Sequence, residues 1–179
     1  MQHDKPHKQE EEKERLDDFT EQCRIELALM EETTQEIVLL LADIRVDRQI
    51  PSVRNRAAAA SLTQSFYNGI ENILKRTSKY CGVALPKSEQ WHSELALRFT
   101  LENHAKYELP MLLPPKIVAA ATILRRFRHV IMHGYAMNLD WEHMSINVDL
   151  VPEIFPSFLA AVEEFLAQEK HRIASSTES

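Results

Sequence analysis

The chain has few of the residues that build turns, metal sites or membrane spans. Only three of its 179 residues are glycine, which disfavours a turn-rich β architecture. Its two cysteines, Cys23 and Cys81, form no C-x-x-C pair, so neither a zinc ribbon nor a disulfide framework is indicated. The longest strongly apolar run, residues 37–42, is far too short to span a bilayer, and no signal peptide precedes the charged start. We therefore expect a soluble protein of the reducing cytoplasm, without membrane association.

The charge of the chain is uneven along its length. The net charge is -6, which argues against non-specific binding of nucleic acid, since such binding needs many phosphates to be neutralised. Residues 109–139 nevertheless contain Lys116, Arg125, Arg126 and Arg128 and no acidic residue. This stretch is therefore the positive island of the chain, and it could supply the localised basic cleft that a nucleic-acid enzyme requires.

Apolar residues recur at helical spacing through most of the sequence, and the length fits a single domain. One long amphipathic helix is predicted from about residue 10 to 45, with a buried stripe that Leu27 and Val38 widen. After a break at residues 50–52, Ser52 is expected to cap a second helix that ends near Gly82 and packs antiparallel to the first.

The second half of the chain predicts shorter helices. A third is expected over residues 88–101 and a fourth over 115–133, where Pro115 suits the first turn and Gly134 the C-terminal cap. Asp140 is expected to cap a short helix, and Pro152 to stand near the start of a last one. The prediction is an all-α, up-and-down bundle of four to five main helices, forming one domain over residues 10–173 between flexible tails at 1–9 and 174–179.

The most informative segment runs from Arg128 to Tyr135, with the sequence Arg-His-Val-Ile-Met-His-Gly-Tyr. RNA can be cleaved without a metal when its own 2′-hydroxyl attacks the adjacent phosphate. His133 could move the proton in such a reaction, because an imidazole titrates near neutrality. Arg128 could stabilise the charge that develops on the phosphate oxygens, through its planar and permanently charged donors.

The spacing of Arg128 and His133 adds a geometric constraint. Five residues at about 100° each place the two positions about 140° apart around an ideal helix, so one straight helix does not aim both at one atom. Either the long arginine side chain bends back near the helix end, or a two-fold axis brings two copies of the helix together.

The pattern R-x-x-x-x-H-x-Y resembles the signature of the HepT toxins, minimal members of the HEPN superfamily of helical ribonucleases. Further blocks resemble a HepT-like branch in sequence and order over roughly residues 52–172: residues 65–74, 85–87 with Trp91 and His92, 126–130, and 139–142. The resemblance implies a HEPN-like bundle, a symmetric homodimer with its cleft at the interface, and RNA as the substrate. It also implies that Arg128 and His133 are catalytic, without a cofactor, and yield a cyclic phosphate and a 5′-hydroxyl.

Tyr135 distinguishes HepT toxins from other HEPN proteins. In that family a paired antitoxin, the nucleotidyltransferase MntA, transfers AMP onto this tyrosine. The resemblance therefore implies a type VII-like toxin–antitoxin system, in which one or more adenylates block the cleft with negative charge and bulk. Tyr135 would be a switch and not a catalyst.

The other polar residues near the motif have alternative roles. His129 stands where the family usually has another polar residue, and it could orient His133 or contact RNA, while Arg125 and Arg126 could hold the RNA backbone. A metal shared by His129 and His133 is not expected, because HVIMH lacks the glutamate of H-E-x-x-H and has no obvious third ligand beyond His143 or Glu142.

Structural roles are favoured for several further polar and aromatic residues. Asn68, Glu71 and Asn72 are expected to satisfy one another or a helix end, although they could line the cleft floor. Trp91 and His92 are expected to anchor the third helix, with stacking of RNA on Trp91 as the alternative. The alternative function is a non-catalytic HEPN module that binds nucleotide, RNA or protein, and this alternative fits the acidic balance of the chain equally well.

Overall fold

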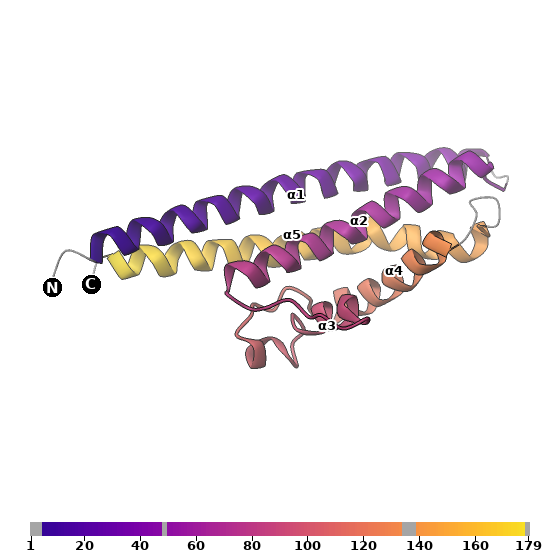
Figure 1. Ribbon diagram of the computed structural model, residues 1–179. Helices are drawn as coiled ribbons and strands as arrows, with labels where there is room; N and C mark the ends of the chain where they lie inside the picture. The colour runs from indigo at the N-terminus through magenta and orange to yellow at the C-terminus, as the bar shows by residue number, and fades with distance from the viewer. Residues whose placement is uncertain (1–4, 48–49, 134–138, 178–179) are drawn as a thin grey trace.

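The computed structural model describes residues 5–47, 50–133 and 139–177, and within these ranges the chain is almost entirely helical (Figure 1). The elements are α1 (Lys5–Asp47), α2 (Val53–Tyr80), α3 (Trp91–Leu97), the short 3-10 helix η1 (His104–Tyr107), α4 (Pro115–His133) and α5 (Trp141–Thr177). The described residues contain no strand, only an isolated β-bridge between Thr100 and Leu113. The predicted all-α fold is confirmed. None of the described helices combines the length and the apolar character needed to cross a bilayer.

Three long helices form the body of the molecule. In Figure 1, α1 (indigo) and α5 (yellow) run side by side, and α2 (magenta) packs against both, antiparallel to α1 as predicted. α4 contacts both α2 and α5, and the short α3 contacts α2 and α4 at the edge of the molecule. The core that joins these helices includes Phe66, Ile70 and Ile73 of α2 and Val151 and Phe158 of α5, all nearly inaccessible to solvent. Their burial removes most of their apolar surface from water and holds the layers together.

The stripe predicted for the first helix is buried with one exception. The buried members are Leu16, Phe19, Cys23, Leu27, Met30, Ile37, Leu41 and Ile44. Val38 is 48% exposed, so it does not widen the stripe as predicted. Both Cys23 and Cys81 are free thiols.

The ends of α1 and α5 extend beyond the predicted bounds. α1 begins at Lys5 and α5 continues to Thr177, so the segments assigned to tails contain helical residues. These two ends support each other, because Gln9 Nε2 donates to the carbonyl of Ser176 at 3.1 Å and Arg172 Nη2 pairs with Glu12 at 2.8 Å. Contacts between residues so far apart in sequence explain why local patterns made both helices too short, with α1 starting too late and α5 ending too early.

Two predicted helix starts are confirmed. The Ser52 hydroxyl accepts a hydrogen bond from the backbone N–H of Asn55 at 3.2 Å, which caps α2, and Gly82 follows that helix with a φ of 73°. α4 begins at Pro115 and ends at His133, with the bounds that the sequence predicted. Gly134, the expected cap, lies outside the described residues.

Two predictions for the remaining helices need correction. α3 is shorter than predicted, because the Thr100 hydroxyl donates to the carbonyl of Leu97 at 2.9 Å and the chain then turns so that Leu113 N donates to Phe99 O at 3.1 Å. Asp140 does cap the next helix, accepting from the Glu142 N–H at 3.0 Å. However, that helix does not stop before Pro152: α5 is one continuous helix containing both Pro152 and Pro156.

The continuity of α5 has a physical explanation in its buried face. Each internal proline removes one backbone hydrogen bond, a cost of about 3 kcal/mol in an isolated helix. On both sides of Pro152 the helix buries large apolar side chains, Val148, Val151, Ile154, Phe155 and Phe158. Fully burying such residues stabilises the fold by about 1.5–3 kcal/mol each, so their summed burial outweighs the loss at the prolines.

Candidate functional site

Arg128 lies on α4 and reaches toward α3. Phe127, the preceding residue, is buried in the core with Leu124 and Ile117, which fixes the rotation of α4. Arg128 itself is half-buried, and its Nη1 lies 3.4 Å from Nε2 of His92. The motif arginine therefore meets a side chain that comes 36 residues earlier in the chain.

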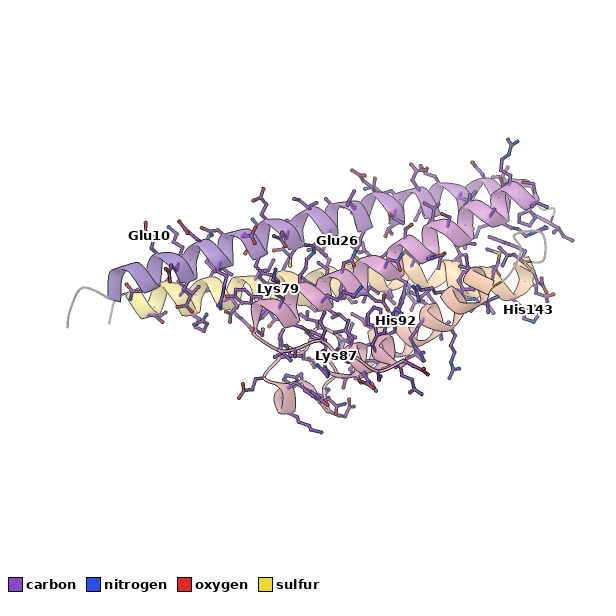
Figure 2. The ribbon with its side chains drawn as sticks, viewed as in Figure 1. Glu10, Glu26, Lys79, Lys87, His92 and His143 are labelled. Atoms are coloured by element: carbon purple, nitrogen blue, oxygen red, sulfur yellow. The ribbon has the colours of Figure 1, made fainter. Side chains whose placement is uncertain are left out.

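The contact with Arg128 fixes how His92 carries its proton. A guanidinium only donates hydrogen bonds, so Nε2 of His92 must accept. Nδ1, the other ring nitrogen, then carries the hydrogen and donates it to Oε1 of Glu71. The indole ring of Trp91 also stacks on the imidazole, with 3.5 Å between ring centroids. His92, labelled in Figure 2, is thus held by a carboxylate on α2, a guanidinium on α4 and its neighbour on α3.

Glu71 is the buried end of this series of contacts. It is only 4% exposed, and a carboxylate in such a place is costly unless it is paired. Its partners are His92 and the hydroxyl of Tyr67, one helical turn earlier on α2. Burial raises the pKa of Tyr67 well above its ordinary value, and the adjacent negative charge of Glu71 raises it further. Tyr67 therefore stays a neutral donor to Glu71.

The positive charge of Arg128 is not cancelled by direct pairing. Within the described part of the chain it forms no salt bridge with a carboxylate, and its buried Nε has no hydrogen-bond partner. His92 stands between the guanidinium and the negative charge of Glu71. This arrangement orients Arg128. Its remaining N–H groups are not used by a carboxylate of the described residues, so the guanidinium can still bind an anion.

The structure separates the two other arginines of the positive island. Arg125 is half-buried and lines a cavity of about 220 Å³ together with Tyr67, Ser93 and Thr122. The positive charges of Arg125 and Arg128 act to lower the pKa of Tyr67. Burial and the charge of Glu71 have larger effects, so the pKa is raised on balance. Arg126 instead is exposed and lines a different hollow, of about 440 Å³, with Asp140 and His143. Arg125 and Arg128 thus share one side of α4, and Arg126 lies on another.

Three of the predicted site residues are not described in full. His129 and His133 belong to α4, with His133 as its last residue, but their side chains lie outside what the structure describes. Tyr135 lies outside the described residues altogether. The described site therefore consists of Arg128 and Arg125 with the contacts that hold them.

Glu71 and His92 lie closer to the candidate site than the sequence predicted. Both were expected to serve the fold, Glu71 by satisfying neighbouring polar groups and His92 by anchoring α3. The structure does bury Glu71, but it also links the pair directly to Arg128. A glutamate among the apolar residues of α2 was the one available signal, since an acid at such a position needs a specific partner.

Comparison with known proteins agrees with this architecture. The described helices form an all-helical bundle that fits the HEPN fold. A family model described as HepT-like protein matches residues 58–168, more than half of the chain. The chain belongs to the HepT-like family. The matched region contains Glu71, His92 and the whole segment from Arg128 to Tyr135. Searches of curated proteins and of solved structures gave no match.

Proposed function

We propose that this protein is the toxin of a type VII-like toxin–antitoxin system, a metal-independent endoribonuclease that works as a homodimer. The observation that carries the proposal is the setting of Arg128. Its guanidinium is oriented by His92, which Glu71 holds in turn, and no carboxylate of the described residues pairs with it directly. A purely structural arginine at this position would be expected to end on a carboxylate.

The reaction follows from the chemistry of the two motif side chains. His133 accepts the proton of an RNA 2′-hydroxyl, and the 2′-oxygen forms a bond to the adjacent phosphorus. Arg128 donates to the phosphate oxygens while negative charge builds on them. The bond from phosphorus to the 5′-oxygen then breaks, and that oxygen takes up a proton. The products are a 2′,3′-cyclic phosphate and a 5′-hydroxyl, without gain or loss of electrons.

Dimerisation is proposed to complete the site. α4 is a single helix from Pro115 to His133, without a break between Arg128 and His133. The two residues therefore stay about 140° apart around the helix axis. A two-fold axis beside the end of α4 would place His133 of one protomer near Arg128 of the other. Arg125 would then contact the RNA backbone on the same side of α4 as Arg128, with His129 as a further contact.

Tyr135 is proposed as the point of control. A cognate MntA-like nucleotidyltransferase would join the tyrosine oxygen to the α-phosphate of ATP and release pyrophosphate. The added AMP brings negative charge two residues from His133, where the phosphate of the RNA must bind. The modified toxin would therefore repel its substrate.

A cleavage assay tests the ribonuclease proposal. Unmodified wild-type protein and the variants Arg128→Ala and His133→Ala are incubated with end-labelled RNA in excess chelator. Each substitution is expected to lower the cleavage rate by about a hundredfold or more, and light scattering should show that both variants remain dimers. If both variants cleave RNA like the wild type, or if chelator abolishes cleavage, the proposal is wrong. A wild-type protein that leaves every RNA intact would favour the binding module instead.

A further inference from the structure

A second basic surface lies on α2, away from the motif. It is a groove of about 500 Å³ between α1, the C-terminal half of α2 and the segment that follows α2. Its polar lining includes four cations and one acidic residue: Arg15, Lys75, Arg76, Lys79 and Asp18. Tyr80 and Leu85 are among the apolar residues of its wall. On a chain of net charge -6, such a concentration of positive charge is unexpected.

The cations of this groove differ in how far they are neutralised. Arg76 pairs with Glu26 at 3.4 Å and donates to Gln22, so its charge is partly used within the fold. Lys75 and Lys79 form no ion pair with any residue that the structure describes. Lys79 is also exposed, so its ammonium can reach a ligand in the groove.

The groove is connected to the site at Arg128. Glu71, Lys75 and Lys79 stand four residues apart along α2, so they share one face over about 12 Å. The ammonium of Lys75 lies 4.7 Å from the ring centroid of Trp91, which stacks on His92. Contacts therefore run without a gap from Arg128 through His92 and Trp91 to Lys75. Figure 2 labels His92, which lies on α3, and Lys79, which lies on α2.

We propose that this groove is a subsite for the phosphate backbone of single-stranded RNA, occupied by the part of the strand that extends beyond the cleavage site. The proposal rests on the proposed ribonuclease function, which it deepens. Lys75 and Lys79 would neutralise successive phosphates, while Trp91 bridges the distance to Arg128. Lysines on an extended surface bind phosphates as point charges without reading bases, so the subsite favours longer strands over particular sequences.

Binding of RNA that cannot be cleaved tests the subsite. The probes are fluorescent single strands carrying a 2′-O-methyl group at every nucleotide, one of about 20 nucleotides and one of about four. Their affinities are measured by anisotropy for the wild type, for Lys75→Ala/Lys79→Ala, and for Lys13→Ala/Lys170→Ala. The last variant removes the same charge from two exposed lysines outside the groove. Thermal melting shows whether the variants keep the wild-type fold.

Lys75→Ala/Lys79→Ala is expected to bind the long strand at least about fivefold more weakly than Lys13→Ala/Lys170→Ala, with the short strand much less affected. Its slope of log affinity against log salt should also fall by about 1.4, the contribution of two phosphates of a single strand. Equal affinities of the two double variants for the long strand would overturn the subsite. So would a wild-type protein that binds neither strand.

The cleavage assay separates this proposal from the function on which it rests. If the wild type cleaves RNA but the two double variants bind the long strand equally, the ribonuclease stands and the subsite fails. If the wild type binds the long strand through Lys75 and Lys79 but cleaves no RNA, the subsite stands and the ribonuclease fails.

Discussion

Arg128 Nη1 lies 3.4 Å from His92 Nε2, so the motif arginine is held by a histidine from another helix whose second nitrogen is bonded to Glu71. The role we assign to His92 is to position Arg128 and not to touch the RNA. Because the proposed role of Arg128 is to stabilise the charge of the transition state, loss of its orientation should lower kcat more than it raises KM.

His92→Leu is therefore expected to reduce kcat for RNA cleavage by about tenfold, with a smaller effect on KM. His92→Gln should retain more activity, because its amide oxygen can still accept from Arg128. Initial rates across a range of RNA concentrations measure both constants, and His171→Leu, at an exposed histidine on α5, is the matched control.

His92→Leu in an Arg128→Ala background distinguishes a positioning role of His92 from a general loss of folding. If His92 acts only through Arg128, His92→Leu should have little further effect on a protein that already lacks the guanidinium. Additive losses in the double variant would contradict the positioning role.

The contacts of this site also mark the limit of prediction from sequence. The bounds of α4 and the cap at Ser52 follow from local chemistry, since Pro115 suits a first helical turn and a serine hydroxyl caps the turn after it. The pairing of Glu71 with His92 depends on how α2, α3 and α4 pack, and no local pattern contains that information. The prediction that a helix starts near Pro152 was wrong, because burial of the apolar face of α5 stabilises the helix by more than the proline destabilises it.

Arg128→Lys tests whether the shape of the guanidinium matters. Lysine keeps the positive charge but lacks the planar fork that can donate to a phosphate and to His92 together. We expect the cleavage rate to fall by about tenfold or more, with RNA affinity reduced much less. A lysine variant that cleaves at the wild-type rate would show that charge alone is sufficient at this position.

The environment of Tyr80 predicts how the stability of the fold changes at alkaline pH. Burial and the hydrogen bond that Tyr80 donates to Glu169 at 2.7 Å raise the pKa of Tyr80 to about 12. In the unfolded chain the phenol ionises near its ordinary pKa of 10.0. The folded state therefore holds the proton more tightly, and this contribution to stability, complete below pH 10, is lost as the pH rises from about 10 to 12.

Denaturant unfolding at a series of alkaline pH values measures this loss. Tyr80→Phe removes the ionisable hydroxyl, so the stability of the variant should fall less steeply between about pH 10 and 12 than that of the wild type. Tyr107→Phe serves as the control, because the Tyr107 hydroxyl is not part of the contact with Glu169. Identical slopes for Tyr80→Phe and the wild type would show that Tyr80 does not carry the effect.

One paired measurement shows whether this protein is a ribonuclease whose activity is blocked at Tyr135. The protein is expressed with and without a cognate nucleotidyltransferase, and each sample is analysed for intact mass and for RNA cleavage in excess chelator. We expect the unmodified protein to cleave RNA, and a mass gain in multiples of AMP, mapped to Tyr135, to coincide with loss of cleavage. Tyr135→Phe should stay unmodified and active in both samples. If the unmodified protein leaves RNA intact, it is not a ribonuclease, and if the modified protein cleaves as fast as the unmodified form, Tyr135 is not the point of control.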